Sequence, residues 1–444
     1  RNSSQAKIRI TSTDGQNISA VSSDFKIKGA LQVGYPAGGE SFVVGSNPVV
    51  TGTKSAAVTA IKIEFIDDSA SPATTTLAAS YAVVSGNTTW SYSGWTVPDK
   101  ISANPGSPAA KIRVTDVTDP NITNVIATSN SFKVTGSFTV TYPQSSTTWG
   151  VDETRPITWT TNGSISKVNI QWSSNGVTWT NFATNYDNNG NGTTALSITV
   201  PDAITNTFKV RVVAYTDSSV TATSPNFEVK GRLQIANPTA ASTWRVDEYN
   251  YITWTVYGTI SKVNIDYWNQ TIPGWVSITT NAPATVTATA GQYFWKIPNL
   301  IRDDLKVRVI NVADSSVNNE TLGFKIRGKV QVNNPNGSEV YYVYDDPDQA
   351  VKYPITYTVT GGLSQVKIEY LQGGVTWTLI STTNVAGSGT YNYQWDIPGA
   401  LVDICKTVKV RVTDNINSDT TDDSNNNFEI RGRVIVPSPV TTTV

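Results

Sequence analysis

The sequence predicts an all-β protein made of tandem sandwich domains, and three observations support this prediction. A motif of the form Lys-x-Arg-x, in which x is Ile or Val, occurs five times, with its arginines 104, 98, 97 and 103 residues apart. Within each repeat the apolar residues recur with a period of two, as in half-buried strands. Turn signals separate about seven short strands in each repeat of roughly 100 residues, a density typical of an immunoglobulin-like sandwich.

Five glycines mark the predicted domain boundaries. Each copy of the arginine motif precedes a segment such as Phe227 to Gly231, whose glycine leads at once into an alternating strand such as Arg232 to Ile235. Both ends of the chain fall inside this pattern, so we expect it to be part of a longer protein. The predicted divisions are the final strands of one repeat at 1–29, complete repeats at 30–136, 137–231, 232–328 and 329–432, and the first strand of another at 433–444. The boundary glycines are Gly29, Gly136, Gly231, Gly328 and Gly432.

Alternation within the strands assigns their inward faces. In the segment Lys167 to Trp172, the apolar residues share one face and the polar residues share the other. The preceding strand is Ile157-Thr158-Trp159 in the second repeat. The first repeat has Val49-Val50-Thr51-Gly52 there, so we expect different lateral contacts in that repeat. The tryptophans assigned to the core are Trp159, Trp172, Trp254, Trp295 and Trp395.

Composition argues against most enzyme chemistry. The chain has no His, no Met and one Cys, so it lacks the commonest general base and metal ligand and cannot form an intrachain disulfide. Its 33 Lys and Arg balance 34 Asp and Glu, which gives no basic surface for nucleic acid. No apolar run approaches the roughly 18 residues of a membrane span. We therefore expect sandwiches without disulfides, no enzyme activity, no nucleic-acid partner and no membrane span in this segment.

A set of ordered motifs carries a family resemblance. They are Trp149 to Glu153, Ile157 to Trp159, Ser166 to Ile170, Gly176 to Trp179 and Phe227 to Gly231. These motifs resemble the Ser/Thr-rich repeat of surface-anchored proteins, found in fungal wall proteins and in large bacterial envelope proteins. The resemblance implies an immunoglobulin-like fold, secretion and a role at the cell surface or wall, with no catalytic residues to carry over. The 104 Ser and Thr, 13 Trp and 19 Tyr residues also favour an extracellular all-β protein.

Each repeat carries an acidic corner that an immunoglobulin topology places at the same pole as its basic exit junction. We therefore predict ion pairs that stiffen the junctions. The alternative is a cadherin-like calcium clamp, which the neighbouring cations oppose, and its strongest position is Asp345 to Asp348. The predicted pairs are Asp152 and Glu153 with Lys230 and Arg232, Asp247 and Glu248 with Arg327 and Lys329, and Asp345, Asp346 and Asp348 with Arg431 and Arg433.

Two further segments resemble ligand sites, and each also has a simpler interpretation. Asp187, Asn189 and Asn191 match the first, third and fifth positions of a calcium loop, but Ile198 replaces the glutamate at the twelfth, so the sequence favours a hairpin. Trp268 and Trp275 are the expected exposed aromatic pair and thus the candidate glycan site. In the segment Ser173 to Trp179, by contrast, we expect a turn followed by a strand whose tryptophan packs inward.

The single-glycine junctions indicate an extended rod, because one residue is too short for a flexible linker. The expected function is structural: a rod- or lattice-forming segment of an S-layer or extracellular fibre that associates with itself at the cell surface. One alternative is an adhesin or an array that binds cell-wall or surface glycans, with a site in the first repeat near its Ser69 to Trp90 insertion. Another is a spacer in a giant secreted enzyme. Sequons such as Asn87-Thr88-Thr89 occur no more often than chance predicts, so a glycoprotein is an expectation of the class alone.

Overall fold

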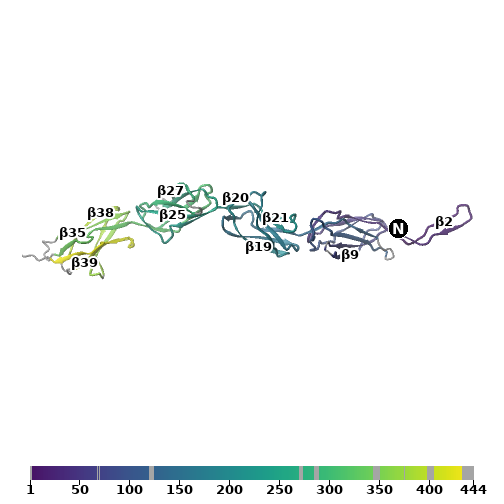
Figure 1. The fold of residues 1–444 in the computed structure, drawn as a ribbon, viewed down its shortest axis with the longest axis horizontal. Helices are drawn as coiled ribbons and strands as arrows, with labels where there is room; N and C mark the ends of the chain where they lie inside the picture. Colours follow the sequence, from purple (N-terminus) through teal and green to yellow (C-terminus); the bar gives the residue numbers. More distant parts are fainter. Residues whose placement is uncertain are drawn as a thin grey trace, which may run out of the picture. The chain divides into compact units, whose positions relative to one another are not determined.

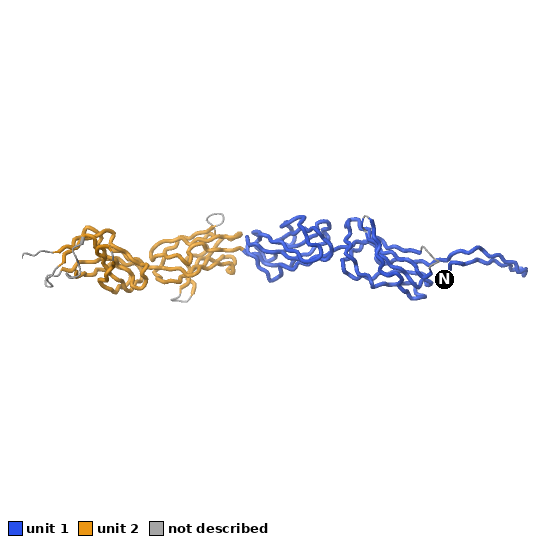
Figure 2. Tube along the Cα trace, turned by 90° about the horizontal axis from the view of Figure 1, so that it is seen from below, with its two compact units in different colours: residues 1–230 blue, residues 231–444 orange. Residues whose placement is uncertain are grey.

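The computed structural model describes residues 3–67, 69, 71–119, 125–269, 274–284, 290–343, 351–374, 376–397 and 405–432. These residues form strands, turns and loops (Figure 1). The chain divides into two compact units, residues 1–230 and 231–444, each containing two of the complete repeats (Figure 2). Among the residues that the structure describes, there is no helix that could cross a membrane.

Repeat 137–231 shows the plan of one sandwich. Its first sheet has the order β14-β16-β19, formed by β14 (Ser137–Tyr142), β16 (Thr154–Asn162) and β19 (Gly192–Thr199). Its second sheet has the order β15-β22-β20-β17-β18, formed by β15 (Thr148–Gly150), β22 (Phe227–Lys230), β20 (Thr205–Ala214), β17 (Lys167–Ser173) and β18 (Thr180–Asp187). The short strand β21 (Thr221–Thr223) also pairs with β20.

The seven strands expected for this repeat become nine because its first and last strands are each divided in two. β14 pairs antiparallel with β16, whereas β15 crosses to the second sheet and pairs parallel with β22. At the other end, β21 and β22 pair with different parts of β20. Two antiparallel-rich sheets packed face to face with this order form an immunoglobulin-like sandwich.

The other complete repeats follow the same plan. The first repeat contains β5 (Leu31–Tyr35), β6 (Ser41–Val43), β7 (Val50–Lys54), β8 (Ala60–Ile66), β9 (Thr74–Ala82), β10 (Thr89–Tyr92), β11 (Lys111–Asp116), β12 (Ile126–Thr128) and β13 (Lys133–Thr135). The third contains β23 (Arg232–Asn237), β24 (Thr243–Arg245), β25 (Tyr249–Tyr257), β26 (Lys262–Asn269), β27 (Gly274–Pro283), β28 (Ala290–Lys296), β29 (Arg302–Leu305), β30 (Val307–Asn311), β31 (Asn318–Glu320) and β32 (Phe324–Arg327). The fourth contains β33 (Lys329–Asn334), β34 (Val340–Val343), β35 (Lys352–Thr360), β36 (Gln365–Gln372), β37 (Trp377–Asn384), β38 (Gly389–Asp396), β39 (Cys405–Asp414), β40 (Thr421–Asp423) and β41 (Phe428–Gly432).

Residues before the first complete repeat form two hairpin-like pairs. β1 (Ser3–Ala6) pairs with β4 (Phe25–Ile27), and β2 (Arg9–Thr11) pairs with β3 (Ser19–Val21). The segment therefore contains strands, and its assignment to a preceding repeat stays a prediction. The expected first strand of another repeat, at 433–444, lies outside the described residues.

Large aromatic side chains fill the sandwich interiors, as the alternation predicts. Trp159 and Trp254 are 0 % and 1 % exposed, and Trp295 and Trp395 are also buried. Trp172 is only half-buried, but its ring stacks on the buried ring of Phe208 at a centroid distance of 5.3 Å. The inward face of each strand is therefore the one that the apolar residues mark.

The first repeat fills the same part of its core from the opposite strand. In the third repeat, Trp254 on β25 lies opposite Gly291 on β28. In the first repeat, Gly52 on β7 lies opposite Trp90 on β10. A Cβ atom on either glycine would overlap the facing indole ring. One ring occupies this space in both repeats, so Trp90 compensates for the missing tryptophan in the segment Val49 to Gly52.

Replacing Gly291 by Ala tests this packing. The added methyl group would overlap Trp254 and the carbonyl oxygen of Ala284, and overpacking of this kind costs about 1–3 kcal/mol. Calorimetry of the full chain should show a lower melting temperature for one transition. Gly389→Ala is the control, because a Cβ there would lie 3.6 Å from Cε2 of Tyr391, an ordinary van der Waals contact. Equal melting profiles for the two variants would contradict this account of the core.

Candidate functional site

The boundary glycines are tightly packed. A Cβ atom on Gly136 would lie 2.6 Å from the carbonyl oxygen of Asn162, and one on Gly231 would lie 2.9 Å from Cδ1 of Ile260. A Cβ on Gly328 would overlap Leu363. Glycine is required at Gly136 and Gly328 because the chain passes directly against the next repeat, and Gly231 packs against the repeat that it begins.

The two outer boundary glycines flank the complete repeats. One residue, Ala30, separates Gly29 from β5, and Gly432 is the last residue of β41. Gly136, Gly231 and Gly328 each lie between two strands, and the division of the chain into repeats at the five glycines stays a prediction.

Within the first unit, the turn after β16 contacts the preceding repeat. The side-chain amide of Asn162 donates a hydrogen bond to the carbonyl oxygen of Val44 at 2.7 Å. The backbone N–H and the hydroxyl of Ser164 both donate to the carboxylate of Asp99. These bonds join the two repeats on one side of Gly136.

An ion pair closes the other side of this junction. Lys133 on β13 lies 2.6 Å from the carboxylate of Asp217 and donates a hydrogen bond to Ser219 at 2.9 Å. The Lys133 and Asp217 side chains are only 13 % and 14 % exposed. Burial raises the pKa of Asp217, but hydrogen bonds from Lys133 and Ser219 outweigh it and hold the pKa below its usual value.

The second unit repeats the turn contact with different residues. The N–H of Gly362, in the turn after β35, donates to the side chain of Asn299 at 2.8 Å. The adjacent Gly361 lies against Val246 and Ile301 of the preceding repeat. Ile301 packs against the cores of both repeats, so the two hydrophobic interiors are continuous through this side chain.

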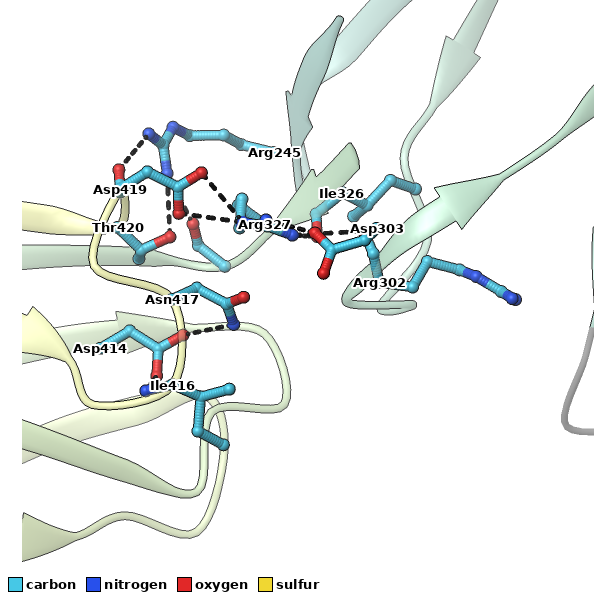
Figure 3. Close-up of polar contacts among 11 residues, drawn as sticks. Arg245, Arg302, Asp303, Ile326, Arg327, Asp414, Ile416, Asn417, Asp419 and Thr420 are labelled. Atoms are coloured by element: carbon cyan, nitrogen blue, oxygen red, sulfur yellow. Dashed lines mark hydrogen bonds and ion pairs between the residues drawn. The ribbon is translucent and has the colours of Figure 1, made fainter. Parts of the chain in front are cut away.

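Arg327 is the centre of the polar contacts at this second junction (Figure 3). It is the last residue of β32, and its side chain is 5 % exposed. Its Nε donates to both carboxylate oxygens of Asp419, at 2.9 and 3.1 Å, from the loop between β39 and β40. Another nitrogen of the same guanidinium pairs with Asp303. Arg327 thus joins a carboxylate of its own repeat to one of the next.

The neighbouring Arg245 reinforces this cluster. It donates to the carbonyl oxygen of Gly328 at 2.9 Å and to that of Asp419 at 3.2 Å (Figure 3). Burial disfavours the charged form of Arg327, but its bonds to Asp303 and Asp419 raise the pKa above the usual value.

Several residues of the predicted junction pairs have partners other than the expected ones. The expected partners of Arg327 are Asp247 and Glu248, whereas its carboxylate partners are Asp303 and Asp419. Asp247 lies 3.0 Å from Lys296 instead. Glu248 lies 3.5 Å from Lys329, which is one of its predicted partners. Asp303 and Asp419 lie outside the acidic-corner motif, so the spacing of that motif could not identify them as partners of Arg327.

In the second repeat, the acidic corner also has contacts within the repeat. Glu153 accepts hydrogen bonds from the N–H of Gly150 and from Arg155, at 2.9 and 2.7 Å. Lys230 lies 3.2 Å from Glu228. Asp152 adopts a left-handed conformation with φ 65°, which Asp tolerates better than most residues. The recurrence of the corner therefore has a local, conformational cause.

Two further residues of the predicted pairs, Arg232 and Arg431, contact residues outside the acidic corners. Arg232 lies over the ring of Tyr257 at 4.2 Å, and Arg431 pairs with Glu429. The other residues of the fourth corner, Asp345, Asp346, Asp348 and Arg433, lie outside the described residues. The pairs and the calcium alternative predicted for them stay predictions.

The loop that resembles a calcium site forms bonds within the protein. Asp187 pairs with Lys167, and the side chain of Asn191 accepts a bond from the N–H of Gly163 at 2.7 Å. Asn189 bonds to Thr194 and Thr193 across the turn. Among the described residues, no group of three or more acidic or Cys side chains is placed to hold a metal ion.

An arginine–tryptophan stack recurs on the outer face of the second sheet. The guanidinium of Arg211 lies 4.1 Å from the ring centre of Trp179. The same arrangement joins Arg308 to Trp275 at 4.2 Å and Arg411 to Trp377 at 3.8 Å. The prediction that Trp179 packs inward is therefore wrong. Both halves of the stack belong to motifs visible in the sequence, but only the strand register places them together.

This stack also changes the interpretation of the predicted glycan pair. Trp268 and Trp275 are cross-strand neighbours in edge-to-face contact at 5.4 Å, and both are half-buried. Arg308 covers one face of Trp275. The two rings are thus partly exposed, and the glycan site predicted for them stays a prediction.

The strand order and the registers define a tandem array of immunoglobulin-like sandwiches. No protein-family model matches the chain, and a search of curated proteins gives no significant match. The chain is similar to solved structures of such domains, at low TM-scores. They include the I67-I69 fragment of the titin I-band (9 % identity, TM-score 0.26, covering 67 % of this chain and 99 % of that one) and the ICAM-5 D1-D4 ectodomain fragment (11 %, 0.27, 91 % and 100 %). Fibronectin(III)-like modules of Clostridium thermocellum CbhA are a further example (14 %, 0.17, 45 % and 94 %). The fold assignment rests on the strand order.

A double-mutant cycle on Arg327 and Asp419 tests the second junction. Arg327→Gln, Asp419→Asn and the double variant should reveal a coupling free energy of about 1 kcal/mol in chemical unfolding, because one partner is shielded and the other is half exposed. Lys329 and Glu248, 36 % and 46 % exposed, provide the control cycle, with coupling near zero. Equal coupling in the two cycles would show that Arg327 has no special role.

The pH dependence of the first junction follows from Asp217. Its pKa in the folded chain lies below the usual 3.8, so its contribution to stability is present above that pH and is lost as the pH falls through the lower, folded value. Titration of the Asp217 carboxyl carbon by NMR should give a midpoint below 3.8. In Lys133→Gln the midpoint should rise. A midpoint that does not respond to this substitution would remove the ion pair from the explanation.

Proposed function

We propose that this chain is a structural segment of a secreted cell-surface protein, whose repeats form a rod or lattice of the S-layer or extracellular-fibre type. The observation that carries the proposal is the construction of the junctions. Within each unit, one packed glycine joins two sandwiches, and shielded ion pairs flank it. Such joints favour fixed spacing over free rotation, which suits a protein that must hold a defined length.

Composition supports the same class. Polar Ser and Thr side chains occupy the wet faces of the strands, as in the Ser/Thr-rich repeats of surface-anchored proteins that the motifs resemble. The absence of histidine and the single cysteine leave few residues for catalysis, so the proposal includes no enzyme activity. The partner in this proposal is the protein itself, in a lattice or filament.

A glycan-binding array is the second candidate, and a groove in the first repeat favours it. The groove has a volume of about 610 Å³ and is lined by both polar and apolar residues, including Gly34, Thr51, Tyr81, Asn87 and Trp90. Gly34 leaves the backbone accessible, as close ligand approach requires. Trp90, however, is 5 % exposed and offers little ring surface to a sugar.

Electron microscopy of the purified chain and of the native cell envelope tests the structural proposal. We expect a periodic lattice or filament whose spacing fits domains of about 35–45 Å along the strands. High salt should loosen the junctions by screening their ion pairs, whereas EGTA should leave them unchanged. Dispersed chains at every concentration, with binding in a glycan panel, would instead support the glycan-binding candidate.

A further inference from the structure

The two sheets of each sandwich have outer edges of different character. The strands β9, β18, β27 and β37 form one edge, and each pairs with its neighbour through at least one register shift. Such bulges hinder the addition of another strand. The strands β10, β19, β28 and β38 form the other edge, and their pairing contains no register shift. The second edge is therefore the better template for strand addition.

This regular edge is partly covered in the first two repeats. The hydroxyl of Tyr81 donates to the carbonyl oxygen of Ser91 on β10 at 2.9 Å, and that of Tyr186 donates to Ala195 on β19 at 3.2 Å. In the third repeat the register places Ala282 at the corresponding position, and a methyl group cannot make this bond. Among the described residues, β28 therefore lacks the tyrosine cap found on β10 and β19.

The composition of β28 favours association. Its sequence from Ala290 to Lys296 contains one charged residue, Lys296 at its end, which lies 3.0 Å from Asp247. Among the residues described, β28 has one hydrogen-bonded neighbouring strand, β25. A nearly uncharged edge strand without proline or bulge is a site for pairing with another strand.

Three exposed aromatic rings lie beside this edge. Tyr249, Tyr251 and Phe294 are 54 %, 47 % and 51 % exposed. Phe294 on β28 contacts Tyr249 at 4.9 Å and Tyr251 at 4.7 Å, both on β25. The three rings therefore form a partly exposed aromatic ridge beside the edge, and aromatic side chains are enriched at protein–protein interfaces.

We propose that β28 pairs antiparallel with β28 of a second copy of this chain, with Phe294 opposite Phe294 of that copy. In this register Gln292 lies opposite Lys296, so no like charges meet. The two aromatic ridges become continuous across the new strand pair, and aromatic cross-strand pairs stabilise sheets. The second copy is preferred over another protein because the strand is compatible with itself in charge and shape. This inference rests on the proposed self-association and specifies its contact.

Disulfide trapping tests the register in the full chain. With the native Cys405 replaced by Ser, Phe294→Cys should form a disulfide-linked dimer on mild oxidation, because directly opposed residues in antiparallel strands have Cα atoms about 4.5–5.5 Å apart, within the range that a disulfide spans. Ser197→Cys in the same background is the matched control. Ser197 holds the equivalent position on β19 of the second repeat, where Tyr186 covers the edge. It should cross-link only weakly.

Sedimentation equilibrium of the unmodified chain and of Phe294→Lys measures the association itself. Two lysines opposite each other should weaken dimer formation by about tenfold or more, whereas Ser197→Lys should leave it unchanged. Circular dichroism checks that both variants fold.

The outcomes separate this inference from the proposed function. If the unmodified chain associates but Phe294→Lys does so equally well and Phe294→Cys does not cross-link, the β28 contact is overturned and self-association stands. If the unmodified chain is monomeric at all concentrations, both fail. If the chain is monomeric and binds a glycan, and Phe294→Lys no longer binds that glycan, the aromatic ridge is a sugar site and the inference is overturned.

Discussion

The constraint on which the rest of this structure depends is the passage of the chain from one sandwich to the next through a single glycine. Within each unit there is no linker, so the last strand of the first sandwich lies against the turn that follows the second strand of the next one. Gly136 and Gly328 have no room for a side chain there. The polar contacts of Lys133 and Arg327 follow, because close approach leaves backbone and charged groups partly shielded and in need of partners.

The two junctions described use one design with different chemistry. In both junctions, a cation on the final strand of one repeat contacts a loop of the next repeat. This loop lies between β20 and β21 in the first unit and between β39 and β40 in the second. In the first unit the cation is Lys133 and the acceptor is Asp217; in the second they are Arg327 and Asp419. Arg327 has the additional partner Asp303 because its planar guanidinium can bond in several directions. A lysine makes fewer simultaneous contacts of fixed geometry.

The sequence predicts the fold more completely than the site because alternation is a local signal. The strand faces, the buried Trp159 and Trp254 and the boundary glycines all follow from patterns within a few residues. The partners of Arg327 are set by loops 24 and 92 residues away, and no spacing rule brings Asp303 or Asp419 to it. Trp179 was misplaced for the same reason: the strand register, which the sequence does not show, puts Arg211 over its ring.

The division of each first strand has a mechanical consequence. In the second repeat, β15 near the entry of the chain runs parallel to β22 at its exit, and β24 with β32 and β34 with β41 repeat this arrangement. Tension applied at the two ends of a repeat pulls such a pair in opposite directions along the strands. The ladder of hydrogen bonds is then loaded in shear, so its bonds must break together instead of opening one after another. A chain built this way resists extension at every repeat, and the resistance comes from the backbone whatever the surface side chains are.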